Sequence, residues 1–186
     1  KDKYNKYKPI KPKDIKDCKI LITGSTQGFG LEIAKEVNKH KPILIITGRN
    51  KKKMDEIVKM LQRTNEDVYG FAMDLSSKGS SEKLFNLVYD KVGVIDILIN
   101  NAFMSKGSRF LLSKNEEDWT QEFNVNINSS IVLSQKFAYK MKVYKVKGRI
   151  INISSYISKS SNTLQDSGSE ILFKNMLEKF TNMLAE

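Results

Sequence analysis

The chain has 186 residues, of which 40% are hydrophobic and 28% are charged, a composition typical of a globular domain and not of a disordered or collagen-like chain. No apolar run reaches the roughly 20 residues that a membrane-spanning helix needs, so we expect no membrane span. The only cysteine, Cys18, excludes an internal disulfide, and by default we expect a cytoplasmic protein. Since the chain begins at Lys1 and not at Met, we leave open whether a targeting segment has been removed.

The formal net charge is +11, and much of it lies at the amino-terminal end. Residues 1–19 contain eight lysines and three aspartates, a net charge of +5, and they show neither a helical nor a strand periodicity. We interpret residues 1–17 as a solvated basic tail and expect no nucleic-acid partner. Binding of a polyanion through this tail is the alternative. Residues 18–186 are expected to form one domain.

From Cys18 onward, short apolar strands alternate with amphipathic helices. In chain order we expect a strand at 19–23, a turn at 24–30 leading into a helix that ends near 39, a strand at 43–47, a helix over 54–61, a strand at 68–72, a helix over 84–92 and a strand at 94–99. The second half then has one long helix from 116 to about 143, a strand at 149–154, a polar loop at 155–168 and a helix from 173 to the last residue. This alternation predicts an α/β fold, a doubly wound parallel sheet in three α/β/α layers.

The long helix has a start signal and a sustained apolar period. Ser113 and Glu116 have the spacing of a capping box. Trp119, Phe123 and Ile127 then begin an apolar stripe that continues to about residue 143. We therefore predict one continuous helix with a bend.

A glycine-rich segment, Thr23-Gly-Ser-Thr-Gln-Gly-Phe-Gly30, lies where the first predicted strand passes into the first helix. In this position such a segment is typical of a dinucleotide-binding turn. Gly24 allows the tight turn, Gly28 lets the backbone approach a pyrophosphate, and Gly30 lets the helix pack closely on the sheet. The free N–H groups at the helix start attract the anion. The candidate cofactor-binding residues here are Gly24, Ser25, Thr26, Gln27, Gly28, Phe29 and Gly30.

Further motifs follow later predicted elements: Asp74-Leu75 after the third strand, Asn100-Asn101-Ala102 after the fourth, Asn126 in the long helix, and Ser154-Ser155 after the fifth strand. With the T-G-x-x-x-G-x-G turn, they resemble the ordered motifs of the short-chain dehydrogenase/reductase family, which has a Rossmann-like fold. The resemblance covers about residues 17–186. It implies that Asp74 and Leu75 contact the adenine and that Asn101 and Ala102 also bind the cofactor.

The resemblance also implies that Asn126, Ser155 and Lys174 are catalytic. In the family, the serine hydrogen-bonds the substrate carbonyl, the helix asparagine supports a proton relay, and the lysine binds the nicotinamide ribose and lowers the pKa of a tyrosine four residues before it. Here that position holds Glu170. A glutamate has an ordinary pKa of about 4.3, so it is ionised at neutral pH and does not donate a proton as a phenol does. Tyr156, next to Ser155, is an alternative donor that would approach from the loop.

The end of the second predicted strand indicates the cofactor. In this fold a carboxylate at that point binds the ribose hydroxyls of NAD(H) and repels a 2′-phosphate, whereas this chain has Gly48 followed by Arg49. We therefore expect NADP(H) in preference to NAD(H). Gln27, where NADP enzymes of the family often carry a basic residue, adds no support. We expect no metal site, because the only histidine, His40, lies among lysines without partner ligands.

Two further departures from the family bear on function. Phe103 replaces the glycine that follows Asn-Asn-Ala, and the chain ends at Glu186, where family members continue with another strand, so we expect the fold to be incomplete at the carboxyl end. The leading hypothesis is an oxidoreductase that transfers hydride between NADP(H) and a small carbonyl or alcohol substrate. The alternatives are a catalytically impaired nucleotide-binding relative that acts as a sensor or scaffold, and a chain whose loop at 158–169 lacks native residues. Family analogy suggests a homodimer or tetramer built from the long helix and the last helix.

Overall fold

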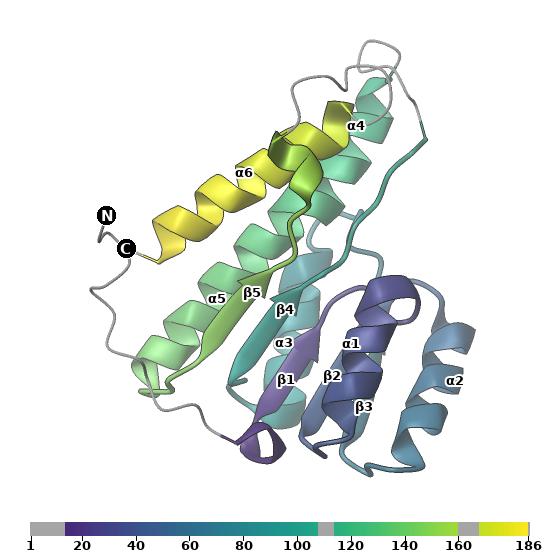
Figure 1. The fold of residues 1–186 in the computed structure, drawn as a ribbon, viewed down its shortest axis with the longest axis vertical. Helices are drawn as coiled ribbons and strands as arrows, with labels where there is room; N and C mark the ends of the chain where they lie inside the picture. The colour runs from purple at the N-terminus through teal and green to yellow at the C-terminus, as the bar shows by residue number, and fades with distance from the viewer. Residues whose placement is uncertain (1–13, 108–113, 160–167, 186) are drawn as a thin grey trace.

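The computed structural model describes residues 14–107, 114–159 and 168–185, which form a parallel sheet with helices on both faces (Figure 1). The sheet has five strands, in the order β3-β2-β1-β4-β5. The strands are β1 Lys19–Ile22, β2 Ile43–Gly48, β3 Val68–Ala72, β4 Ile97–Asn100 and β5 Arg149–Asn152. All neighbouring strands run parallel, so the predicted α/β sheet is confirmed. The strand order reverses beside β1, and in such sheets ligands bind at the carboxyl ends of the strands at this point.

The helices complete the three predicted layers. They are η1 Ile15–Asp17, α1 Gly28–Asn38, α2 Lys51–Gln62, α3 Ser80–Val92, α4 Glu116–Phe123, η3 Asn124–Asn128, α5 Ser129–Val143, η4 Tyr156–Lys159 and α6 Gly168–Leu184. α1 and α2 cover one face of the sheet, α3 and α5 cover the other, and α6 runs beside α5 and β5 (Figure 1). Within the described ranges, no helix combines the length and the apolar character that crossing a bilayer requires.

Alternate residues of each central strand supply the two layers of the core. Ile20 and Ile22 of β1 pack in the cluster that includes α1 and α2, whereas Leu21 packs in the cluster that includes α3 and α5. These three side chains are fully buried. A parallel strand that is covered on both faces has apolar residues at successive positions, which explains the unbroken apolar run in the sequence.

Two predicted strand limits are wrong by two residues or more, and three others differ by one residue. β4 begins at Ile97 and not at residue 94, because the Asp96 carboxylate accepts a hydrogen bond from the Lys19 backbone N–H at 2.8 Å and anchors the start of β1. β5 ends at Asn152 and not at residue 154, because Ser154 follows a different path, on which its hydroxyl donates to Glu178 at 2.6 Å.

The predicted long helix is confirmed with its start at Glu116, and only the capping residue differs from the prediction. α4, η3 and α5 follow one another without a break. The N-cap is Asn115, whose side chain accepts a hydrogen bond from the Asp118 N–H at 2.8 Å, whereas the predicted cap Ser113 lies outside the described residues. η3 is a π-helical segment, a local widening of the helix that is frequent at functional sites.

The ends of the chain carry more structure than their composition suggests. Ile15 packs against the core, so residues 14–17 contact the domain although composition assigns them to the tail. At the other end, α6 stops at Leu184, before the predicted limit at the last residue. The predicted loop contains the short η4 turn, and residues 160–167 lie outside the described ranges. Glu170 and Lys174 both lie in α6.

Candidate functional site

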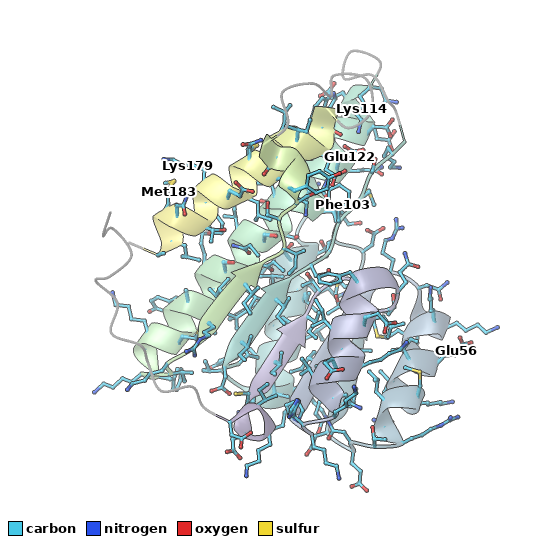
Figure 2. The ribbon with its side chains drawn as sticks, viewed as in Figure 1. Glu56, Phe103, Lys114, Glu122, Lys179 and Met183 are labelled. Carbon is cyan, nitrogen blue, oxygen red and sulfur yellow. The ribbon has the colours of Figure 1, made fainter. Side chains whose placement is uncertain are left out.

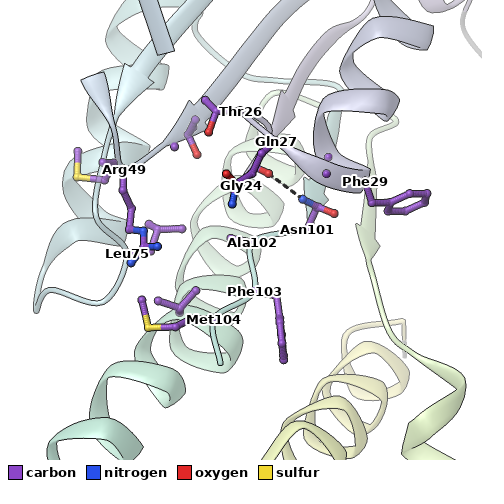
Figure 3. Close-up of a pocket in the computed structure, with 16 residues that line it drawn as sticks. Gly24, Thr26, Gln27, Phe29, Arg49, Leu75, Asn101, Ala102, Phe103 and Met104 are labelled. Carbon is purple, nitrogen blue, oxygen red and sulfur yellow. Dashed lines mark hydrogen bonds between the residues drawn. The ribbon is translucent and has the colours of Figure 1, made fainter. Parts of the chain in front are cut away.

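A pocket of about 310 Å³ opens at the carboxyl ends of β1, β2 and β4 (Figure 3). The predicted cofactor residues that line it are Gly24, Thr26, Gln27, Gly28, Phe29, Gly30, Arg49, Leu75, Asn101 and Ala102. These residues come from four separate parts of the chain. The fold therefore brings the glycine-rich turn, the end of β2 and the segments after β3 and β4 to one cavity.

Two glycines let the turn pass close to the segment after β4. Gly24 has a φ of +65°, and a Cβ there would lie 2.8 Å from Ala102 Cα. A Cβ on Gly30 would lie 2.6 Å from the Gly24 carbonyl oxygen and would overlap the Asn101 amide. The Asn101 Nδ2 donates to the carbonyls of Thr23 at 3.0 Å and Gly24 at 3.1 Å. Any larger side chain at either glycine would separate these two segments.

α1 begins at this pocket without a side-chain cap. Its N-cap residue, Gln27, makes no capping hydrogen bond, and its first turn contains no acidic residue. The amide N–H groups of a first helical turn have no partner within the helix, and they attract an anion. The close backbone approach and the uncapped helix start together fit the pyrophosphate of a dinucleotide.

The end of the pocket at β2 carries two cationic side chains. Arg49 lines the cavity, and Lys53 of α2 donates from Nζ to Gln27 Oε1 at 2.9 Å. Gln27, which has no charge of its own, thus has an ammonium group beside it. Lys53 is half-buried, whereas Lys51 is exposed and paired with Asp55 at 3.0 Å. Lys53 is not recognisable as a pocket residue from the sequence, because it is one of three consecutive lysines and nothing local separates it from the other two.

Two predicted cofactor residues do not line the pocket. Ser25 is fully buried, and its hydroxyl donates to the Ile22 carbonyl at 2.8 Å. Asp74 is exposed, and its carboxylate accepts from both the backbone N–H and the hydroxyl of Ser76, at 3.0 and 2.8 Å. In this structure Ser25 therefore stabilises the glycine-rich turn through a buried hydrogen bond to the end of β1, and Asp74 caps the turn after β3.

Lys174 lies on α6, outside the pocket lining. Its buried Nζ donates to the Ile153 carbonyl at 2.6 Å. The Phe103 ring centroid is 4.8 Å from the same Nζ, and Figure 3 shows this side chain directed from the pocket toward α6. Burial lowers the pKa of Lys174, while the Glu170 carboxylate one turn earlier opposes that shift. The Phe103 ring that contacts the candidate catalytic cation thus also lines the pocket.

Asn126 and Ser155 also lie outside the lining. Asn126 is buried in η3, where its Oδ1 accepts from the Met104 N–H and its Nδ2 donates to the Met104 carbonyl, both at 2.8 Å. It therefore fixes the segment that follows β4. Ser155 is half-buried after β5, and its carbonyl accepts from the Ser158 N–H at 3.1 Å. Tyr156, the alternative proton donor, is 89% exposed.

Four pocket residues were not singled out from the sequence: Thr47, Met73, Met104 and Val125. Each is the immediate neighbour of a residue that was, so their places at the ends of β2, β3 and β4 and in η3 were the available signal. Among the described residues, no group of three or more His, Cys, Asp or Glu side chains is arranged to hold a metal ion.

Comparisons with known proteins agree with this geometry. The family model described as short chain dehydrogenase matches residues 19–167. Over 141 residues the chain is 35% identical to an uncharacterized oxidoreductase, YvrD, of Bacillus subtilis, covering 76% of this chain and 52% of that protein. Over 146 residues it is 32% identical to the 3-oxoacyl-[acyl-carrier-protein] reductase FabG of Aquifex aeolicus, covering 78% of this chain and 58% of that protein. The chain thus spans little more than half the length of these curated relatives.

Solved structures share the fold. A metagenomic short-chain oxidoreductase in complex with NADP superposes with a TM-score of 0.80 at 24% identity, covering 88% of this chain and 72% of that one. A short-chain dehydrogenase from Streptomyces avermitilis gives a TM-score of 0.78 at 22% identity, covering 89% and 58% of the two chains. At this identity the likeness concerns the fold, and it matches the predicted Rossmann-like sheet.

Proposed function

The chain belongs to the short chain dehydrogenase family, and from this membership we propose that it is an oxidoreductase that transfers hydride between NADP(H) and the carbonyl or alcohol group of a small molecule. The observation that carries the proposal is the pocket in which the uncapped start of α1 meets the close-packed turn at Gly24 and Gly30. Backbone N–H groups in this arrangement bind the pyrophosphate of a dinucleotide. A bound nicotinamide supplies the hydride donor or acceptor.

Preference for NADP(H) is supported by the charges at the end of β2. Arg49 lines the pocket, and Lys53 lies against Gln27. Two cations beside the adenosine end favour a 2′-phosphate, which an acidic residue at this point would repel. Among the relatives by structure, the metagenomic oxidoreductase contains NADP.

In the proposed reaction this chain's residues bind the cofactor and orient the substrate. Ser155 hydrogen-bonds the substrate carbonyl, and Lys174 binds the nicotinamide ribose once its contact with Phe103 opens. Asn126 holds the segment after β4 through both polar atoms of its amide. Glu170 occupies the position of the family's tyrosine, so the proposal assigns the proton donor to no described side chain.

The test begins with cofactor binding. Calorimetric titration of the purified chain is expected to give a tighter dissociation constant for NADPH than for NADH. Gly24→Val should abolish binding of both, because its side chain would overlap Ala102. Oxidation of NADPH is then followed with a panel of aldehydes, ketones and dicarbonyls. Absence of heat with both nucleotides would overturn the proposal.

A second candidate function is nucleotide sensing or scaffolding without turnover. Glu170 replaces the phenol, and Phe103 covers Lys174, so both features favour a protein that binds the cofactor and does not react. The discriminating experiment is Glu170→Tyr. If the wild type binds NADPH and reduces no carbonyl, and Glu170→Tyr restores turnover, the sensor function is supported.

We also propose a cytoplasmic homodimer or tetramer that uses the α4–α6 side of the molecule. Phe123, Leu172 and Met176 are 40–46% exposed there and line a shallow apolar groove with Trp119 and Phe173. Exposed apolar groups of this kind favour association. Sedimentation analysis should give a dimer or larger for the wild type, and Leu172→Glu should yield the monomer.

A further inference from the structure

A buried ion pair at α4 takes no part in the function proposed so far. Lys114, just before α4, pairs with Glu122 on α4, and their side chains are 1% and 0% exposed. In Figure 2, Lys114, Glu122 and Phe103 follow one another from the top of α4 toward the sheet. The Lys114 ammonium also lies 5.7 Å from the Trp119 ring centroid.

The Lys114–Glu122 pair is bonded to two other segments. Glu122 Oε1 accepts from the Lys106 backbone N–H at 2.6 Å, and Lys114 Nζ donates to Ser169 Oγ at 2.8 Å. Lys106 lies three residues after Phe103, and Ser169 lies in the first turn of α6, next to Glu170. The pair therefore connects the segment that carries the Phe103 ring to the helix that carries Lys174.

Net stability does not account for this pair. Replacement of a buried ion pair by apolar residues of similar volume is often neutral or stabilising, because both charges must be removed from water. For Glu122 the free-energy cost of desolvation is only partly compensated, since its Oε2 is buried without a hydrogen-bond partner among the described residues. Its distinctive contribution is geometric, because Oε1 accepts from two segments that are distant from α6 in sequence.

We propose that Glu122 and Lys114 are positioning residues that hold the first turn of α6 against residues 103–106 and so keep the Phe103 ring over Lys174. Any effect of this pair on catalysis rests on the proposed function, whereas the contact between Phe103 and Lys174 can be followed without enzyme turnover. Loss of the pair would let α6 and the Phe103 segment move apart. Water would then reach the Lys174 ammonium.

The test uses a paired apolar replacement that leaves no buried charge unpartnered. Glu122→Leu with Lys114→Met removes both hydrogen-bonded links while filling the space. Glu82→Leu with Lys136→Met is the matched control, since that ion pair is 2.6 Å long and its lysine also lies over a ring, 5.4 Å from the Phe85 centroid. Lys114→Arg retains the cation and N–H donors for both Glu122 and Ser169.

The readout is the titration of Lys174, followed by NMR of protein that incorporates ¹³C-labelled lysine during expression and assigned with Lys174→Arg. In the paired apolar variant, the pKa of Lys174 should rise toward the ordinary lysine value, because burial lowers it in the wild type. In the Glu82 and Lys136 control variant and in Lys114→Arg, Lys174 should titrate as it does in the wild type. Because the proposed reaction needs the contact between Lys174 and Phe103 to open, the KM for NADPH should fall about twofold or more in the paired apolar variant, and the turnover number with a dicarbonyl probe should not fall.

These outcomes separate the inference from the proposed function. If the wild type reduces no carbonyl, the proposed reaction fails, and the titration of Lys174 alone then decides the positioning role. An unchanged Lys174 titration in the folded paired variant would overturn the inference. An equal change in the Glu82 and Lys136 control would overturn it as well, because the effect would then not depend on this link.

Discussion

At the residue scale, Gly24 and Gly79 separate backbone strain from crowding. Both have positive φ, +65° and +76°, but an added Cβ meets Ala102 Cα at 2.8 Å only at Gly24, and it meets open space at Gly79. Gly79→Ala should therefore lower the free energy of unfolding by about 1–2 kcal/mol and leave cofactor binding intact. Gly24→Ala should cost more stability and weaken NADPH binding about tenfold or more, because the turn must move away from Asn101 and Ala102. Urea denaturation and fluorescence titration measure the two effects, and equal effects at both glycines would contradict the explanation.

Lys53 should contribute to cofactor choice through charge. Lys53→Met removes the ammonium beside Gln27 and is expected to weaken NADPH binding about fivefold, as for a partly exposed ion pair of about 1 kcal/mol. NADH binding should not change, because NADH lacks the 2′-phosphate. Lys52→Met is the matched control, since it removes the same charge from the next position of α2 on an exposed side chain. A similar loss with Lys52→Met would assign the effect to net charge and not to Lys53.

Lys174 should make stability depend on pH in a defined direction. Burial lowers its pKa in the folded state below the ordinary value of about 10.5. Between the two values the unfolded chain binds a proton that the folded chain does not, so the free energy of unfolding rises with pH through this window. Below the window the buried ammonium destabilises the fold, and there Lys174→Met should gain most relative to the wild type.

The check is urea unfolding of wild type and Lys174→Met at several pH values. The stability difference between them is expected to shrink as the pH rises through the lowered pKa of Lys174. Lys179→Met, at an exposed position on the same helix, is the control for the removal of a lysine charge. A difference for Lys174→Met that stays constant would mean that the ammonium is not destabilised by burial.

The residues that line the pocket were largely predictable from the sequence, whereas the hydrogen-bond partners of their side chains were not. The glycines, Arg49, Asn101 and Ala102 line the cavity because a βα turn leaves few alternatives for where the backbone goes. Ser25 and Asp74 belong to the same motifs, yet they bond to neighbouring backbone groups instead. Short polar side chains have local backbone partners within reach in every turn, so residue type alone does not decide which partner is used.

At the scale of the elements, η3 ties the long helix to the segment after β4. Asn126 is suited to this because its amide both accepts and donates, matching the N–H and C=O of Met104. Asn126→Asp keeps the acceptor and places a carboxylate against the Met104 carbonyl. We expect it to lower the free energy of unfolding by about 2–3 kcal/mol, the cost of an unsatisfied buried group.

Thermal unfolding of Asn126→Asp measures this cost, and Asn182→Asp on the exposed side of α6 is the control. The control should change stability by less than about 0.5 kcal/mol. The measured loss for Asn126→Asp should be smaller at acidic pH, where the carboxyl is protonated and again offers a donor. Equal stability of the two variants would show that the Met104 link contributes little.

The elements themselves were predictable because their apolar periods are long, while their limits were not. β4 begins three residues later than its apolar run, since Asp96 is needed to bond Lys19 from a distant part of the chain. The capping residue of the long helix is Asn115 and not Ser113, and both residue types are good N-caps. Local patterns rank such candidates almost equally, and tertiary contacts select among them.

At the scale of the whole molecule, alternation of strands and helices was enough to predict a parallel three-layer fold, because crossover connections leave few arrangements. The Lys114–Glu122 pair was beyond such reasoning. Its links reach to Lys106 and Ser169, which are separated by more than sixty positions in the sequence and show no shared pattern. Sequence also named Phe103 as a departure without indicating that its ring lies over Lys174.

The whole molecule should respond to its cofactor as a single cooperative unit. A ligand that binds only the folded state at about 100 times its dissociation constant adds about 2.7 kcal/mol to the free energy of unfolding. For a domain of this size, that corresponds to a rise of roughly 5–11 °C in the melting temperature. If the proposed preference is correct, NADPH should raise the melting temperature more than NADH at equal concentration, since Arg49 lines the pocket at the end of β2 and Lys53 contacts Gln27 there. The fragment 2′,5′-ADP should reproduce most of the NADPH effect, because Phe103 limits the pocket toward Lys174. Equal rises in melting temperature with NADPH and NADH would contradict a binding site for the 2′-phosphate. No rise with any nucleotide would contradict nucleotide binding in the pocket.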